Sequence, residues 1–166
     1  HLFEVRDEVI DIRGEDIVPH VIEPSYGIDR MCYAVLEQAY DEDIADGESR
    51  TVMRLSPKVA PVQVAVFPLM TRDGLDTLAE EIILAFHKKG ILAEYDDSGA
   101  IGRRYRRQDE IGTPFAVTVD YESKENNTVT LRSRDTMKQV RIAIADLPEA
   151  VMALVNGDIT FASLMP

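Results

Sequence analysis

The chain has 166 residues and a mass of 18.6 kDa, which suffices for one ordinary domain and a short additional segment, and its composition is that of a soluble globular protein. We expect neither a membrane-spanning helix nor an internal disulfide, because no apolar run approaches about 20 residues and the only cysteine is Cys32. Taken alone, the net charge of −12 argues against a nucleic-acid-binding chain, since lysine and arginine are needed to neutralise phosphates.

The first part of the chain, residues 1–58, is predicted to be a remnant of a larger sheet domain. It opens on His1 in mid-pattern and without a methionine, so we expect the chain to be part of a longer protein. A strand near residues 18–22 and a helix over residues 31–40 are predicted, and they cannot bury a core alone. We expect Cys32, on this helix, to be a buried small hydrophobic residue in a reducing, cytoplasmic setting. Polar residues from 41 to 48 and prolines at 57 and 61 mark a boundary unsuited to packing.

Residues 59–166 show a regular alternation of predicted strands and helices. An apolar, β-branched run at 62–68 predicts a buried strand, and apolar residues from Leu75 to Phe86 recur at helical spacing before Gly90. Further strands are predicted at 91–95, 115–119, 128–131 and 137–144, helices at 102–111 and 147–156, and a turn at Asn126 and Asn127. This order, β-α-β-α-β-β-β-α, predicts an α/β fold with a small mixed sheet flanked by helices.

The junction between the first strand and the first helix concentrates polar chemistry. Glu23, Ser25 and Arg30 place a carboxylate, a hydroxyl and a guanidinium within eight residues. Such a set suits the recognition of an ammonium, a small polar group and a phosphate. From the residues alone, an ordinary strand–turn–helix whose polar groups are capping or solvated is the open alternative.

The same stretch carries a family resemblance. The residues from Gly27 to Arg30, with the apolar helix after them, resemble motif 3 of class II aminoacyl-tRNA synthetases, and residues 21–25 are similar to glycyl-tRNA synthetases of the archaeal and eukaryotic type. The resemblance implies that Arg30 packs over the adenine of ATP and reaches its terminal phosphate. The implied ATP-binding residues are Gly27, Ile28, Asp29 and Arg30, and the implied glycine-binding residues are Glu23, Pro24, Ser25, Tyr26 and Gly27.

Residues 101–141 are locally basic. They carry 9 basic and 6 acidic side chains, whereas residues 1–50 carry 4 basic and 14 acidic ones, so a polyanion is expected to dock on the later segment. Within it, four arginines and a tyrosine between 103 and 107 suit an RNA backbone, and a solvated helix with internal ion pairs is the alternative. The run from Gly102 to Gly112 resembles the anticodon-binding domain of the glycyl, histidyl, prolyl and threonyl enzymes. That resemblance makes Arg103 and Arg104 candidates for tRNA contacts, although this segment is largely architectural in the family.

A second basic stretch lies at residues 129–139. Arg132 ends a predicted strand and Arg134 lies in the turn to the next. The resemblance implies that this strand end faces the anticodon bases, with Arg132 and Arg134 as candidates for guanine or cytosine edges or phosphates, and Glu122 and Asp135 as acceptors. The alternative is a hairpin turn with solvated arginines.

The resemblance as a whole implies the C-terminal part of a glycyl-tRNA synthetase. Such an enzyme joins glycine to tRNA(Gly) with ATP and Mg²⁺, works as a homodimer, and needs neither a membrane nor DNA. No side chain here is expected to act as a covalent catalyst or to bind a metal, and we expect this chain alone to be inactive because motifs 1 and 2 are missing from it. The other hypothesis is a non-catalytic, synthetase-like accessory subunit or adaptor module that binds nucleic acid or a protein.

Overall fold

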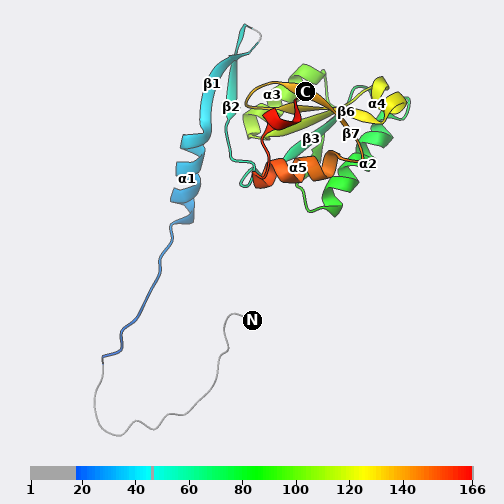
Figure 1. Ribbon diagram of the computed structural model, residues 1–166. Helices are drawn as coiled ribbons and strands as arrows, with labels where there is room; N and C mark the ends of the chain where they lie inside the picture. Colours follow the sequence, from blue (N-terminus) through cyan, green and yellow to red (C-terminus); the bar gives the residue numbers. More distant parts are fainter. Residues whose placement is uncertain (1–17, 46, 166) are drawn as a thin grey trace, which may run out of the picture.

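The structure, a computed structural model, describes residues 18–45 and 47–165, and residues 1–17 of the predicted first domain lie outside this range (Figure 1). In chain order the elements are α1 (Ile28–Ala39), β1 (Tyr40–Ala45), β2 (Glu48–Met53), β3 (Val64–Pro68), α2 (Leu75–Lys88), β4 (Ala93–Tyr95), α3 (Ile101–Ile111), β5 (Phe115–Val119), α4 (Tyr121–Asn126), β6 (Thr128–Ser133), β7 (Gln139–Ala143), α5 (Leu147–Asn156) and the 3-10 helix η1 (Phe161–Leu164). None of the helices in the described ranges is long and apolar enough to cross a bilayer.

The main domain is built on a five-stranded mixed sheet in the order β4-β3-β5-β6-β7. The strand β3 is parallel to β4 and β5, because the helices α2 and α3 return the chain to the same edge, and β5, β6 and β7 are antiparallel neighbours. The predicted α/β fold with a mixed sheet flanked by helices is therefore confirmed.

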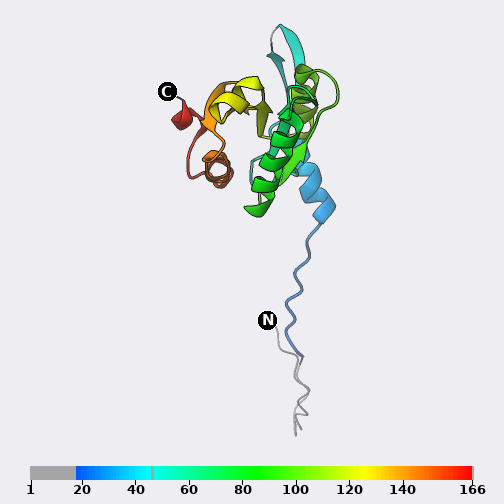
Figure 2. The same ribbon diagram turned by 90° about the vertical axis from the view of Figure 1, so that its right-hand side faces the viewer.

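The two faces of this sheet are covered unequally (Figures 1 and 2). Alternate residues of β3, β5 and β6 point to one face and form the main core with α2 and α5, where Phe86 and Leu147 are fully buried. On the other face α3 packs Ile101 and Tyr105 against Ala65, Phe67 and Ala116. On the same face, beyond α3, Thr130, Gln139 and Arg141 of β6 and β7 are at least partly exposed, and we call this face the open face of the sheet.

The strand predicted at 18–22 is absent, since residues 18–27 form no regular element and extend away from the domain (Figure 1). A lone strand has no neighbour to satisfy its backbone hydrogen bonds. The helix predicted there does form, as α1, but Ala39 is its only buried residue. The expectation that Cys32 is buried is wrong, because Cys32 is exposed on α1.

The polar stretch after α1, predicted to be unsuited to packing, is an antiparallel hairpin of β1 and β2. Gly47 adopts the left-handed conformation (φ 82°) in its turn, and Asp-Gly is a strong hairpin signal in a sequence. The inner face of β2 carries Arg50 and Val52, both buried. On β1, Asp43 forms ion pairs with Arg50 and Arg54, and the half-exposed Asp41 forms one with Arg54.

The connection between β5 and β6 also differs from the predicted simple turn. The short helix α4 fills it, and its first turn is closed by a capping box in which Asp120 accepts from the backbone N–H of Ser123 and Ser123 accepts from that of Asp120. Asn127 then ends α4 in the left-handed conformation (φ 52°), which asparagine tolerates better than most residues.

Candidate nucleic-acid interface

A hollow of about 300 Å³ lies on the open face of the sheet, between α3 and the turn that joins β6 to β7. Its lining comes from residues far apart in the sequence: Gly102, Tyr105, Arg106, Asp109, Arg132, Met137 and Gln139. Two guanidinium groups and an aromatic ring therefore meet at one concave place. The volume lies at the lower end of the range for small-ligand pockets, and arginine with tyrosine is a combination that suits an unstacked RNA base.

Arg132, a predicted anticodon contact, lies in this hollow with its orientation fixed. Its guanidinium carbon stands 4.5 Å from the ring centroid of Tyr105, and its two terminal nitrogens donate to Asp109 at 3.0 and 3.3 Å. The fork geometry of arginine allows this bidentate pair and leaves its other edge free of Asp109. Although Arg132 is only 7% exposed, it lines the hollow, and its contacts with Tyr105 and Asp109 fix the plane of its guanidinium.

Tyr105 is held as firmly as the guanidinium above it. Its hydroxyl hydrogen-bonds Thr118 at 2.6 Å, and its ring meets Phe67 edge to face with 5.2 Å between centroids. Burial raises the pKa of the Tyr105 hydroxyl, so the ring stays neutral at physiological pH. The ring of Tyr105 is therefore a rigid apolar surface beneath the Arg132 guanidinium.

Asp109 balances two buried cations. Besides Arg132, it accepts a hydrogen bond at 3.1 Å from Arg50 of the hairpin, and the side chains of Asp109 and Arg50 are 2% and 0% exposed. Arg50 continues the network outward, because its Nε donates at 2.7 Å to Asp43, which also binds Arg54. Every buried side-chain nitrogen or oxygen in the described ranges has a hydrogen-bond partner, so the charged interior is fully satisfied.

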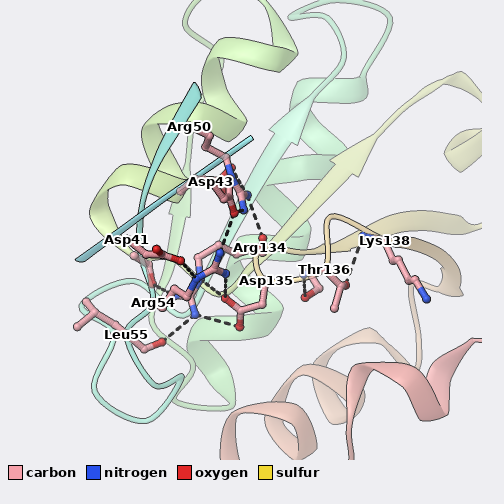
Figure 3. A network of polar contacts seen from close by, with 12 residues as sticks. Asp41, Asp43, Arg50, Arg54, Leu55, Arg134, Asp135, Thr136 and Lys138 are labelled. Carbon is pink, nitrogen blue, oxygen red and sulfur yellow. Dashed lines mark hydrogen bonds and ion pairs between the residues drawn. The ribbon is translucent and has the colours of Figure 1, made fainter. Parts of the chain in front are cut away.

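Arg134, the second predicted anticodon contact in this stretch, is buried in the same network (Figure 3). It donates to the carbonyl oxygens of Gly112 at 2.7 Å and Leu55 at 3.0 Å, and it pairs with Asp135. A direct contact with an RNA base would require these bonds to break. Asp135, which accepts from Arg134, is half exposed. It also forms an ion pair with Arg54, whose Nη1 lies 3.3 Å from Oδ1 of Asp135.

The remaining predicted tRNA contacts are dispersed. Arg104 is buried and donates to the carbonyl oxygens of Pro68, Asp96, Asp97 and Gly99, so it ties together the loops at the ends of β3 and β4. Arg103 is exposed on α3. Glu122 is exposed on α4 and lies 3.3 Å from Arg141.

Gly102, Asp109, Met137 and Gln139 line the hollow but were not among the predicted contacts, whereas Arg106 belongs to the arginine run that was predicted to suit an RNA backbone. The strand register explains Gln139, which lies opposite Arg132 and so on the same face. On that face Thr130 pairs with Arg141, which binds Asp120 at 2.6 Å. The sequence of β7 shows which residues alternate, but only the register with β6 shows which of them share a face with Arg132.

The residues of the predicted glycine and ATP site are not gathered into a pocket. Residues 18–38, which include Glu23, Ser25 and Arg30, are exposed, and Gly27 precedes the first turn of α1. A separate apolar hollow of about 690 Å³ lies between α1 and residues including Met53, Leu55 and Ile111. In the described ranges no group of three or more His, Cys, Asp or Glu residues could hold a metal ion.

Comparison with known proteins relates this domain to a protein family. Residues 63–154 match the anticodon binding domain family. The chain is 49% identical over 156 residues to a glycine–tRNA ligase of Archaeoglobus fulgidus, covering 94% of this chain and 27% of that protein. It is 53% identical over 149 residues to the glycine–tRNA ligase of Methanococcus vannielii, covering 86% of this chain and 25% of that protein.

A solved structure shares the fold. The prolyl-tRNA synthetase of Cryptosporidium parvum, solved with halofuginone and AMPPNP, superposes with a TM-score of 0.60 at 25% identity over 63% of this chain and 23% of that chain. The chain spans about a quarter of the length of the curated relatives it matches. Because the matched residues, 63–154, make up more than half of its length and include α3, β6 and β7, the chain belongs to the anticodon binding domain family.

Proposed function

We propose that this chain is the C-terminal part of a glycine–tRNA ligase and that its main domain binds the anticodon loop of tRNA(Gly). The hollow between α3 and the β6–β7 turn carries this proposal. It combines a tyrosine ring with two guanidiniums, Arg106 and Arg132, on an open sheet face of a domain in the anticodon binding family. The glycine–tRNA ligases at about 50% identity support the choice of glycine.

In this proposal Arg132 reads a base and the surrounding cations hold the backbone. Asp109 uses one N–H of each terminal nitrogen of Arg132, so Nε and the other two N–H groups remain as donors, and a single-stranded base can be recognised by such donors on its Watson–Crick or Hoogsteen edge. Arg103, exposed at the start of α3, and Arg106 are placed to approach phosphates. The buried Arg104 and Arg134 act indirectly, by fixing the loops around the hollow.

The part before the hairpin is proposed to belong to the aminoacylation site of the whole enzyme. Glu23 and Ser25 would hold glycine, and Arg30 would hold ATP, which enters with Mg²⁺. These side chains are exposed here, so the remainder of the catalytic domain is needed to assemble the pocket. The proposal includes a cytoplasmic, homodimeric whole enzyme and no adenylate synthesis by this chain alone.

A binding assay with matched RNAs tests the proposal. An anticodon stem-loop whose anticodon ends in CC is compared with the same stem-loop ending in GG, by fluorescence anisotropy at several salt concentrations. We expect the first to bind at least about fivefold more tightly, because one good bidentate base contact contributes about 1–3 kcal/mol. Equal affinity for the two RNAs at every salt concentration would overturn the proposal.

The alternative, a non-catalytic accessory subunit or adaptor module, has less support. The curated relatives at about 50% identity are glycine–tRNA ligases, and the chain retains the glutamate, serine and arginine of the predicted substrate pocket. An accessory protein would bind both stem-loops alike, so the same assay separates the two functions.

A further inference from the structure

We infer that Arg50, on the hairpin before the matched anticodon-binding family region, is a positioning residue for base recognition in the hollow. This inference rests on the proposed function. Arg50 does not line the hollow, and its side chain is fully buried behind it. It acts by holding the two walls of the hollow, α3 and the β6–β7 turn, at a fixed separation.

The contacts of Arg50 reach both walls from a single nitrogen. Its Nη1 donates to Asp109 of α3 at 3.1 Å. The same nitrogen donates to the carbonyl oxygen of Arg134 in the β6–β7 turn at 3.0 Å (Figure 3). Its Nε donates to Asp43 at 2.7 Å, which anchors the guanidinium to β1. The arginine therefore bridges three segments that lie far apart in the sequence.

Asp109 transmits this placement to the reading residue. The same carboxylate oxygen, Oδ2, accepts from Arg50 and from Nη2 of Arg132, while Oδ1 accepts from Nη1 of Arg132. A shift of Asp109 would therefore turn the plane of the Arg132 guanidinium over Tyr105. Bidentate recognition depends on the orientation of that plane. A small rotation would therefore lower the affinity for RNA with the preferred base more than it lowers the affinity for RNA with other bases.

The hairpin supports the hollow at a second place. The carbonyl oxygen of Ala45 accepts from Arg106, which lines the hollow, at 3.4 Å. The chain after the hairpin also packs closely on the end of α3, because a Cβ atom added at Gly112 would lie 2.7 Å from Leu55. The base-reading unit thus begins at β1 and includes residues before the family match.

Substitution of Arg50 by lysine tests this role while keeping a positive charge in the buried network. A lysine has a single ammonium and no planar fork, so it cannot reproduce the contacts to Asp43, Asp109 and the Arg134 carbonyl together. Arg54→Lys is the matched control, because Arg54 binds Asp41, Asp43 and Asp135 but neither Asp109 nor the hollow. Both variants of the 166-residue chain are compared with wild type, at a temperature at which urea titration shows all three folded.

The readout is the ratio of affinities for the stem-loops ending in CC and GG. We expect R50K to lower this ratio about fivefold, with the affinity for the GG stem-loop little changed, and R54K to preserve it. An unchanged ratio in R50K, or an equal loss of affinity for both RNAs, would overturn the inference, because each outcome places Arg50 outside base reading. If wild type itself has a ratio of one, the proposed function fails first and this inference fails with it.

Discussion

Replacing Asp109 with asparagine tests whether one carboxylate balances two buried guanidiniums. The change keeps the shape of the side chain, but the new amide offers one oxygen and two N–H donors. If the oxygen keeps the bond to Arg132 that is now 3.0 Å long, the amide nitrogen takes the place of Oδ2, which accepts from Arg50 and Arg132. Donors would then face donors, and two buried cations would lose their shared countercharge.

The expected cost follows from this burial. The side chains of Asp109, Arg50 and Arg132 are 2%, 0% and 9% exposed, so water cannot replace the lost partner. Removing one partner of a buried ion pair costs about 3–5 kcal/mol, which is a large part of a typical stability of about 5–15 kcal/mol. Arg50 retains Asp43, and this places the expected loss near the lower end, about 3 kcal/mol.

Urea unfolding followed by circular dichroism measures this loss. With a slope of about 1–3 kcal/mol per molar urea, the midpoint should fall by about 1–3 M while the slope stays unchanged. Asp135→Asn is the control, because that carboxylate is half exposed and its pairs should contribute less than about 1 kcal/mol. A loss below about 1 kcal/mol in D109N would refute the reasoning that Asp109 is the required countercharge.

Acid should weaken the hairpin. Hydrogen bonds from Arg50, with help from Arg54, lower the pKa of Asp43 from 3.8 to about 2, so its contribution of at most about 2 kcal/mol is complete above pH 4 and is lost as pH falls towards 2. Stability measured from pH 6 to 2 should fall less in Asp43→Asn. Met137 lines the hollow in a left-handed conformation (φ 57°) that costs a non-glycine residue about 1–2 kcal/mol. Met137→Gly should therefore keep or raise the urea midpoint yet weaken stem-loop binding, and lower stability would contradict the strain argument.

The sequence predicts most of the main domain because its elements have strong local signals. Apolar residues at helical spacing predict α2, and a short β-branched run gives β5 with the bounds that the structure has, Phe115–Val119. The hairpin was missed because its stability is not local. Arg50 is buried against Asp109, which lies 59 positions later, and the chain around Arg50 is too acidic to predict burial.

The same reason limits what the sequence says about arginines. Arg132, Arg134 and Arg104 are equally charged in the sequence, yet only Arg132 lines the hollow. The other two donate to backbone carbonyl oxygens, such as those of Gly112 and Pro68. Every residue has such an oxygen, so no pattern of residue types reveals which arginine will be used to hold a loop.

The place of the hairpin bears on how the whole protein is divided. The boundary predicted between residues 58 and 59 follows composition, whereas Arg50 and Ala45 contact α3 and the β6–β7 turn of the later domain. Ala39 is the only buried residue of α1, and it is the last residue before β1 begins at Tyr40. Ala39 packs with Leu55 and Ala60, and its carbonyl oxygen accepts from the backbone N–H of Arg54 at 2.6 Å, so the end of α1 is anchored to the hairpin and the chain after it. The contacts of Arg50 and Ala45 therefore join the hairpin to the sheet domain, and a division of the chain before β1 would keep the walls of the hollow and their support in one part.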